Sequence, residues 1–176
     1  MDPSRPLVMA GARYTSSGDA VQDYHVLWGA RHGGAFDHMS IAVLAKGAAG
    51  ELEVRCQGST ARDLAWEGAV LGAALLVVAP AVGTAPAAPG GGNLAGAEGI
   101  ASHLRHTIPE EKLREISQLL DSAESSLLIV AIDRRAIEIS PLLEQAEIAA
   151  VVETKTGDMD AAFYGTLMKA KAKSGA

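Results

Sequence analysis

The sequence predicts an α+β fold, and three observations lead to this prediction. Apolar runs of strand length alternate along the chain with segments whose apolar residues recur at helical spacing. Of the 176 residues, 48% are hydrophobic but only 4% are aromatic, so the core must consist mainly of Ala, Val, Leu and Ile. A run without charged residues, rich in Ala and Gly, covers 68–97. A chain of this length buries roughly 70% of its unfolded surface, so we expect a single domain over residues 1–176.

The first two predicted elements are a strand and a helix. Residues 7–13 form an apolar run that ends at a polar segment, which predicts a buried strand. Apolar residues then recur at helical spacing over 18–31. Ser17 can cap the start of this helix, and Gly33 with Gly34 can end it.

The next predicted elements are a β-hairpin and a helix. The apolar period changes to two over 39–43 and again over 52–56, and the segment KGAAG between them can form the turn. Ser59 or Thr60 can cap a helix that continues into the Ala/Gly-rich run. The chain therefore turns back on itself once before a long helical region begins.

The second half of the chain predicts a helix, a strand, a disturbed helix, a strand and a last helix. The clearest helix signal begins with Thr107, which lies three residues before Glu110 in the pattern of a capping box. Strands are predicted near 126–132 and over the segment IAAVVETK. The helix between these two strands contains Pro141, which removes a backbone donor.

The order of the predicted elements points to a known arrangement. The first six follow the order strand, helix, strand, strand, helix, strand, which is that of a ferredoxin-like fold with helices on one face of a mostly antiparallel sheet. We therefore expect a ferredoxin-like βαββαβ core with an extra C-terminal αβα. We also expect an Ala/Gly-rich helical insertion over residues 60–106 within it.

Three segments carry a resemblance to a known family. They are FDHMSIAVLAKGAAGELEVRCQ, AWEGAVLGAALL and REISQLLDSAESSLLIVAIDRRAIEISPLLEQAEIAAVVETKTGD. The chain from residue 37 to 165 resembles bacterial proteins with a domain of unknown function that are often labelled predicted membrane proteins. The resemblance implies a ferredoxin-like α+β fold with a glycine-rich helical hairpin and implies no known reaction. The chain departs from a smooth Gly/Ala hairpin at Pro80, Pro86, Pro89 and the segment GGGN.

The Ala/Gly-rich run could cross a membrane, bind a phosphate or mediate packing. A spanning helix needs about 20 mainly apolar residues, whereas the strongly apolar part, 69–79, stops at Pro80. A phosphate loop is disfavoured because no strand precedes the segment PGGGNLAG and no Lys-Ser or Lys-Thr pair follows it. Membrane association through a lipid-inserting hairpin stays an alternative.

Packing between copies of the chain is the preferred interpretation of this run. Spaced small residues allow helices to approach closely, and any apolar surface that the sheet does not cover must meet another subunit. The residues expected at this interface are Gly68, Leu71, Gly72, Leu75 and Val78. The alternative is a core helix that packs entirely within its own chain.

Residues with catalytic or ligand-binding chemistry are scattered. Cys56 lies in the predicted hairpin without a histidine or asparagine signature, so we expect a buried thiol rather than a nucleophile. His103 and His106 have a spacing that could hold a metal, but no cysteine or carboxylate motif accompanies them. We therefore expect no catalytic residue, no metal and no cofactor. The other histidines are His25, His32 and His38.

One small-molecule site is conceivable from the aromatic residues. Tyr24, Trp28 and Trp66 could line a ligand pocket if the first helix met the central one, and the alternative for them is ordinary packing. A small-molecule or metal-binding enzyme is therefore the third functional hypothesis.

Composition and the N-terminal segment narrow the remaining possibilities. The net charge of −6, without clustered Lys and Arg, argues against nucleic-acid binding. The segment MDPSRPLVMA lacks the long apolar stretch of a secretory signal, so we expect a cytoplasmic protein. The sequence thus favours a non-catalytic, self-associating protein whose Ala/Gly-rich insertion mediates assembly into a homo-oligomer.

Overall fold

In the part of the chain that it describes, the computed structural model has five strands, four longer helices and two short helical segments, with further helical residues at 159, 161–162 and 165. It describes residues 3–58, 64–83, 94–133, 139–159, 161–162 and 165. The strands are β1 (Pro6–Tyr14), β2 (Phe36–Lys46), β3 (Leu52–Gly58), β4 (Ser125–Asp133) and β5 (Ile148–Lys155). The helices are α1 (Ser17–His32), α2 (Leu64–Val78), α3 (Pro80–Gly83), α4 (Leu94–Thr107) and α5 (Glu110–Ser122), with a 3-10 turn at Ser140–Leu142.

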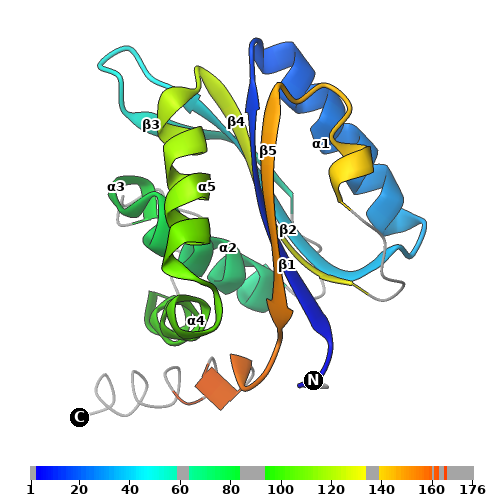
Figure 1. The fold of residues 1–176 in the computed structure, drawn as a ribbon, viewed down its shortest axis with the longest axis vertical. Helices are drawn as coiled ribbons and strands as arrows, with labels where there is room; N and C mark the ends of the chain where they lie inside the picture. Colours follow the sequence, from blue (N-terminus) through cyan, green and yellow to red (C-terminus); the bar gives the residue numbers. More distant parts are fainter. Residues whose placement is uncertain are drawn as a thin grey trace.

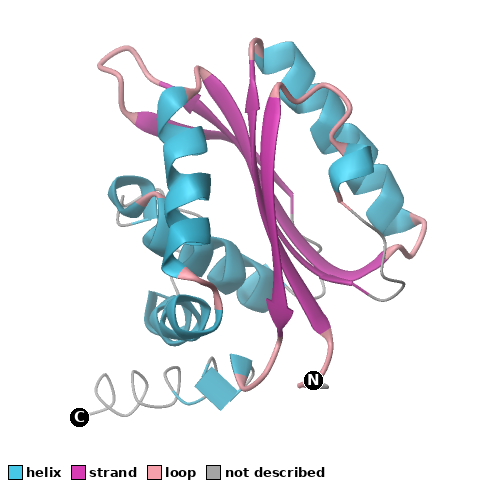
Figure 2. Ribbon diagram, viewed as in Figure 1, coloured by secondary structure: helices cyan, strands magenta, loops and turns pink. Residues whose placement is uncertain are grey.

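The strands form one antiparallel sheet in the order β3-β2-β4-β1-β5. The predicted α+β class is therefore confirmed, and each predicted strand lies inside an observed one (Figure 2). The strand between β1 and β2 is β4, which comes from the second half of the chain, and β3 lies at the outer edge beside β2. The ferredoxin-like order, in which the third strand would take that central place, is not confirmed.

Helices cover both faces of the sheet, so the prediction that they cover one face was wrong. Helix α1 packs on one face, and α2, α4 and α5 pack on the other (Figure 1). The reason is visible in β4, where the segment LLIVAI is apolar and buried at every position. Both faces of such a strand must be covered, because neither carries polar side chains that could meet water.

The ends of the helices differ from the predictions in detail. Ser16, not Ser17, caps α1, because its Oγ accepts a hydrogen bond of 3.1 Å from the N–H of Asp19. Thr107 caps no helix start and instead donates from Oγ1 to the carbonyl of His103 at the end of α4. The predicted cap at residues 59–60 lies outside the described residues.

The predicted C-terminal αβα extension is not confirmed, although the described residues contain a strand, β5, and helical residues at 159, 161–162 and 165. Where a helix disturbed by Pro141 was predicted, the described residues contain the single 3-10 turn. Most of the predicted last helix lies outside the described residues.

Helix α5 lies unusually close to β1 at Gly11. A Cβ atom built on Gly11 would lie 2.7 Å from Cγ2 of Ile116, which is too close for two carbon atoms. We expect Gly11→Ala to lower the free energy of unfolding by about 1.5 kcal/mol, because α5 must shift away from the sheet. Urea unfolding measures the change.

Gly29 on α1 provides the matched control for this prediction. A Cβ atom built there meets no atom within 4 Å. Gly29→Ala should therefore raise the free energy of unfolding by about 0.5–1 kcal/mol, since alanine favours the helix more than glycine does. Equal effects of the two substitutions would contradict the close packing of α5 on β1.

Candidate functional site

The residues predicted to mediate assembly lie inside the chain's own core. Leu71, Leu75 and Val78 are 3%, 0% and 1% exposed, and they belong to the cluster formed by the sheet with α2, α4 and α5. Gly72 is buried and Gly68 is half-buried. These positions on α2 therefore leave almost no surface for contact with a second copy. Within the described residues, no helix combines the length and hydropathy needed to span a bilayer.

The three aromatic residues predicted to line a pocket are not brought together. Tyr24 and Trp28 stack on α1, with ring centroids 6.2 Å apart and ring planes at 5°. Trp66 belongs to α2, on the opposite face of the sheet, and its side chain lies outside the described part of the structure. The sheet separates α1, which carries Tyr24 and Trp28, from α2.

Two other side chains of α1, those of Arg31 and His32, also contact Trp28. The guanidinium of Arg31 lies 5.4 Å from the Trp28 ring centroid, and the His32 ring meets the Trp28 ring edge-on at 5.3 Å. His32 Nδ1 also lies 2.8 Å from the Trp28 carbonyl oxygen. These contacts order side chains along one helix.

His103 and His106 contact backbone carbonyls. His106 Nδ1 lies 2.7 Å from the carbonyl of Ser102, and His103 Nε2 lies 3.3 Å from the carbonyl of Lys155. Among the described residues, no three His, Cys, Asp or Glu side chains are grouped so as to hold a metal ion. The Cys56 side chain lies outside the described part of the structure. The contact of His103 instead joins α4 to the end of β5.

A buried carboxylate that the sequence analysis did not single out joins three parts of the fold. Asp23 on α1 is only 1% exposed. It accepts a hydrogen bond of 3.0 Å from the hydroxyl of Tyr14 on β1. The backbone N–H of Gln145 donates to both of its oxygens, at 3.0 and 3.3 Å. Asp23 therefore fixes the segment that leads into β5 against α1 and β1.

Burial determines the titration of this cluster. Loss of water contact raises the pKa of Asp23 above its ordinary value, although hydrogen bonds from Gln145 and Tyr14 act in the opposite direction. Burial also raises the pKa of Tyr14, and the nearby charge of Asp23 raises it further. A signal was present in the sequence, because Asp23 lies between Ala20 and Leu27 on the buried side of α1.

Two open clefts lie at the end of the sheet where α1 begins. The larger, of about 700 Å³, runs between the β1–α1 turn and the β2–β3 turn. Its charged lining residues are Lys46, Arg55 and Glu124, and Arg55 is paired with Glu53 at 3.0 Å. With mixed charges and one cation already paired, this cleft has no excess charge that would select a ligand.

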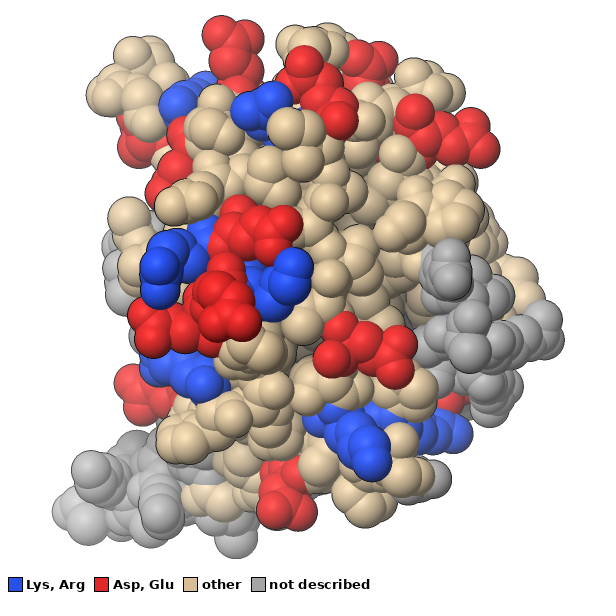
Figure 3. Space-filling model, viewed as in Figure 1, with Lys and Arg blue, Asp and Glu red and all other residues tan. Residues whose placement is uncertain are grey.

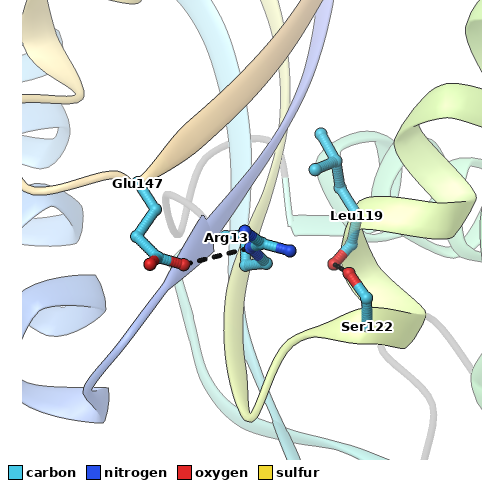
Figure 4. A network of polar contacts seen from close by, with 4 residues as sticks. All are labelled: Arg13, Leu119, Ser122 and Glu147. Atoms are coloured by element: carbon cyan, nitrogen blue, oxygen red, sulfur yellow. Dashed lines mark hydrogen bonds and ion pairs between the residues drawn. The ribbon is translucent and has the colours of Figure 1, made fainter.

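The smaller cleft, of about 250 Å³, lies between the ends of β1, α5 and the start of β5. Arg13 lies between Glu147 and the C-terminal turn of α5 (Figure 4). Its Nε is 3.1 Å from a Glu147 oxygen, and Ser122 Oγ donates to the carbonyl of Leu119. Arg13 therefore fixes the start of β5, as Asp23 does from the other face.

The outer edge of β5 offers unused backbone groups. In an antiparallel pair, alternate residues direct their N–H and C=O groups to the same neighbouring strand. The N–H of Thr156 donates to the carbonyl of Arg5, in register with the β1–β5 pairs. Counting back in steps of two, the residues that bond to β1 are Ile148, Ala150, Val152 and Thr154. The intervening residues, Ala149, Val151, Glu153 and Lys155, direct their backbone groups outward.

Only part of this edge is open within the described residues. β5 pairs with β1 and with no described strand on its other side. The carbonyl of Lys155 is contacted by His103, which leaves Ala149, Val151 and Glu153 as the outward residues. We call these three residues the open edge. Residues 148–152 carry no charge, and Ile148 is 47% exposed.

Figure 3 shows the molecule from the side on which β5 is the nearest strand in Figure 1. An uncharged surface occupies the centre of this face, beside a cluster of charged side chains over α5, and acidic and basic side chains lie below it. The opposite edge of the sheet differs, because β3 carries Glu53 and Arg55 and the register of its pairing with β2 shifts between Val43 and Leu44. Charges and bulges are the usual means of preventing an edge strand from pairing. Along 148–152 β5 has no charge and no register shift in its pairing with β1, and the one charged residue of the open edge is Glu153.

Comparison with known proteins does not identify a relative. No protein-family model, no curated protein and no solved structure matches this chain.

Proposed function

We propose that this protein is a non-catalytic protein that self-associates through the open edge of its sheet. The observation that carries the proposal is the set of outward N–H and C=O groups of Ala149, Val151 and Glu153, on a strand uncharged from 148 to 152. Unpaired backbone groups on an apolar edge strand favour the addition of another strand. The Ala/Gly-rich helix α2 contributes to this function by completing the core rather than by forming the interface.

The other polar clusters support the non-catalytic part of this proposal. Asp23 is held by Tyr14 and Gln145, and it lines neither cleft. Arg13 is paired with Glu147 and lies against α5. Both clusters position the segment that begins β5. Their arrangement stabilises the strand on which the open edge lies.

The particle mass of the full chain, expressed without detergent, tests the proposal. After soluble and membrane fractions are separated, light scattering over a concentration series should give a defined multiple of 18.1 kDa. Val151→Lys places a charge on the open edge and should yield monomers, because a lysine on an edge strand hinders pairing. Val21→Lys, on the exposed side of α1, is the matched control and should leave the mass unchanged.

Other results would contradict self-association through this edge. A chain that stays monomeric at millimolar concentration has no such function. If the protein is found only in the membrane fraction, the alternative of a membrane-associated protein replaces the proposal. Circular dichroism must show that Val151→Lys is folded, since Val151 is half-buried.

A further inference from the structure

We propose that the open edge binds a second copy of this chain, with the two β5 strands antiparallel about a two-fold axis at Val151. The inference rests on the self-association proposed above and adds its symmetry and register. The product is one continuous sheet of ten strands, five from each copy. In a two-fold interface the same surface is used on both subunits, so the open edge must be complementary to itself.

The spacing of the outward residues meets this requirement. Ala149 and Glu153 lie two residues on either side of Val151. A two-fold axis at Val151 therefore pairs Val151 with the partner's Val151, and pairs Ala149 with the partner's Glu153. Each of these pairs exchanges two N–H···O bonds in an antiparallel ladder. Every outward group of the open edge is used, and no group outside it is needed.

Neighbouring registers are excluded by contacts in the chain. Moving the axis to Val152 leaves Ala149 opposite Lys155, whose carbonyl is already contacted by His103, so fewer outward groups are paired. Moving it to Glu153 also places two glutamates opposite one another, and directly opposed like charges destabilise a sheet. Moving it toward the start of the strand requires Glu147, whose N–H donates to the carbonyl of Arg13. His103 thus limits the pairing at one end and Arg13 limits it at the other.

The side chains along β5 also fit this register. On the face covered by α5, Ala150 lies opposite the partner's Val152, so a small residue meets a larger one. The exposed Ile148 lies opposite the partner's Thr154, which shields part of its surface. On the face covered by α1, the two Val151 side chains meet at the axis. No pair in this register brings together two charges of the same sign.

Cysteine cross-linking tests the position of the axis. In a Cys56→Ser background, Val151→Cys should form a disulfide-linked dimer under mild oxidation, because paired Cα atoms lie about 5.5 Å apart. Glu153→Cys is the control. The two Glu153 positions are offset by four residues along the strands, about 13 Å, and should not cross-link.

A mixture of two variants tests the same register with cysteines that lie away from the two-fold axis. Ala149→Cys and Glu153→Cys should each fail to cross-link alone but should cross-link when mixed and allowed to exchange. If Glu153→Cys cross-links alone, this register is wrong. The register is also wrong if the chain has a dimeric mass but neither Val151→Cys nor the mixture cross-links. In both cases self-association itself stands. A monomeric mass for the unmodified chain overturns both proposals.

Charge substitution at Ala149 gives a readout that needs no oxidation. Ala149→Glu places a carboxylate opposite the partner's Glu153 at two symmetry-related positions, so the dissociation constant should rise about tenfold. Ala149→Lys also adds a charge to the edge but places it opposite the same glutamate, so it should raise the constant less than Ala149→Glu does. Equal effects of the two substitutions would also overturn the register.

Discussion

Replacing Leu75 by alanine is expected to lower the free energy of unfolding by about 3 kcal/mol. Leu75 is 0% exposed and lies in the core cluster that α2 forms with the sheet, α4 and α5. Removing most of its side chain leaves a cavity that the surrounding helices fill only partly. Urea unfolding measures the loss, and Val26→Ala, at an exposed position on α1, should change the stability little.

The same variant separates two roles for the Ala/Gly-rich helix. Light scattering should give Leu75→Ala the same assembly mass as the unmodified chain at temperatures where it is folded. A variant with normal stability but a smaller mass would instead place α2 at the interface, as the sequence predicts. The two readouts together therefore distinguish a core helix from a contact helix.

Asp23→Ala is expected to lower the free energy of unfolding by about 2 kcal/mol at neutral pH. The substitution removes the acceptor of the buried Tyr14 hydroxyl and of the partly buried Gln145 N–H. At pH values above the raised pKa of Asp23, part of this loss is offset, because the variant no longer buries an ionised carboxylate. Asp23→Asn is the isosteric control and should lose less, since its amide oxygen can still accept one hydrogen bond.

The raised pKa of Asp23 determines whether Asp23→Ala loses more stability in acid or at neutral pH. The pKa of Asp23 is raised in the folded chain, so the folded chain binds a proton that the unfolded chain has already released. This contribution to stability is fully present below the ordinary pKa of an aspartate, and it is lost as the pH rises through the raised pKa. The loss caused by Asp23→Ala should therefore be larger in acid than at neutral pH. If unfolding of the unmodified chain and of Asp23→Asn shows the same pH profile, Asp23 is not the titrating group.

Local patterns were enough to predict the strands. The apolar runs at 7–13 and 126–132 are bounded by polar or turn-forming residues, and the hairpin is marked by the change of period on both sides of KGAAG. These signals are read within about ten residues and depend little on the rest of the chain. The boundary of α1 was shifted by one residue because Ser16 and Ser17 are both suitable caps.

Strand order and the polar cluster could not be predicted in the same way. The place of β4 between β1 and β2 depends on its pairing with β1, across more than a hundred residues, and with β2, across 80 or more, which no local period encodes. The contact between Asp23 and Gln145 joins residues 122 positions apart through a backbone N–H. Almost every residue type has this group, so the sequence does not indicate which residue makes the contact. The covering of both faces could have been predicted, because LLIVAI in β4 has no polar alternation.

The central position of β4 has a consequence for how the chain folds during synthesis. β1 and β2 share β4 as their common neighbour, and in the sheet they do not touch one another. A nascent chain that ends before residue 125 therefore has α1 and a hairpin but no strand to join β1 to them. Such long-range pairing slows folding and leaves apolar strands exposed in the meantime. β1 can join the hairpin in one sheet only after β4 has left the ribosome, and β5 then completes the sheet.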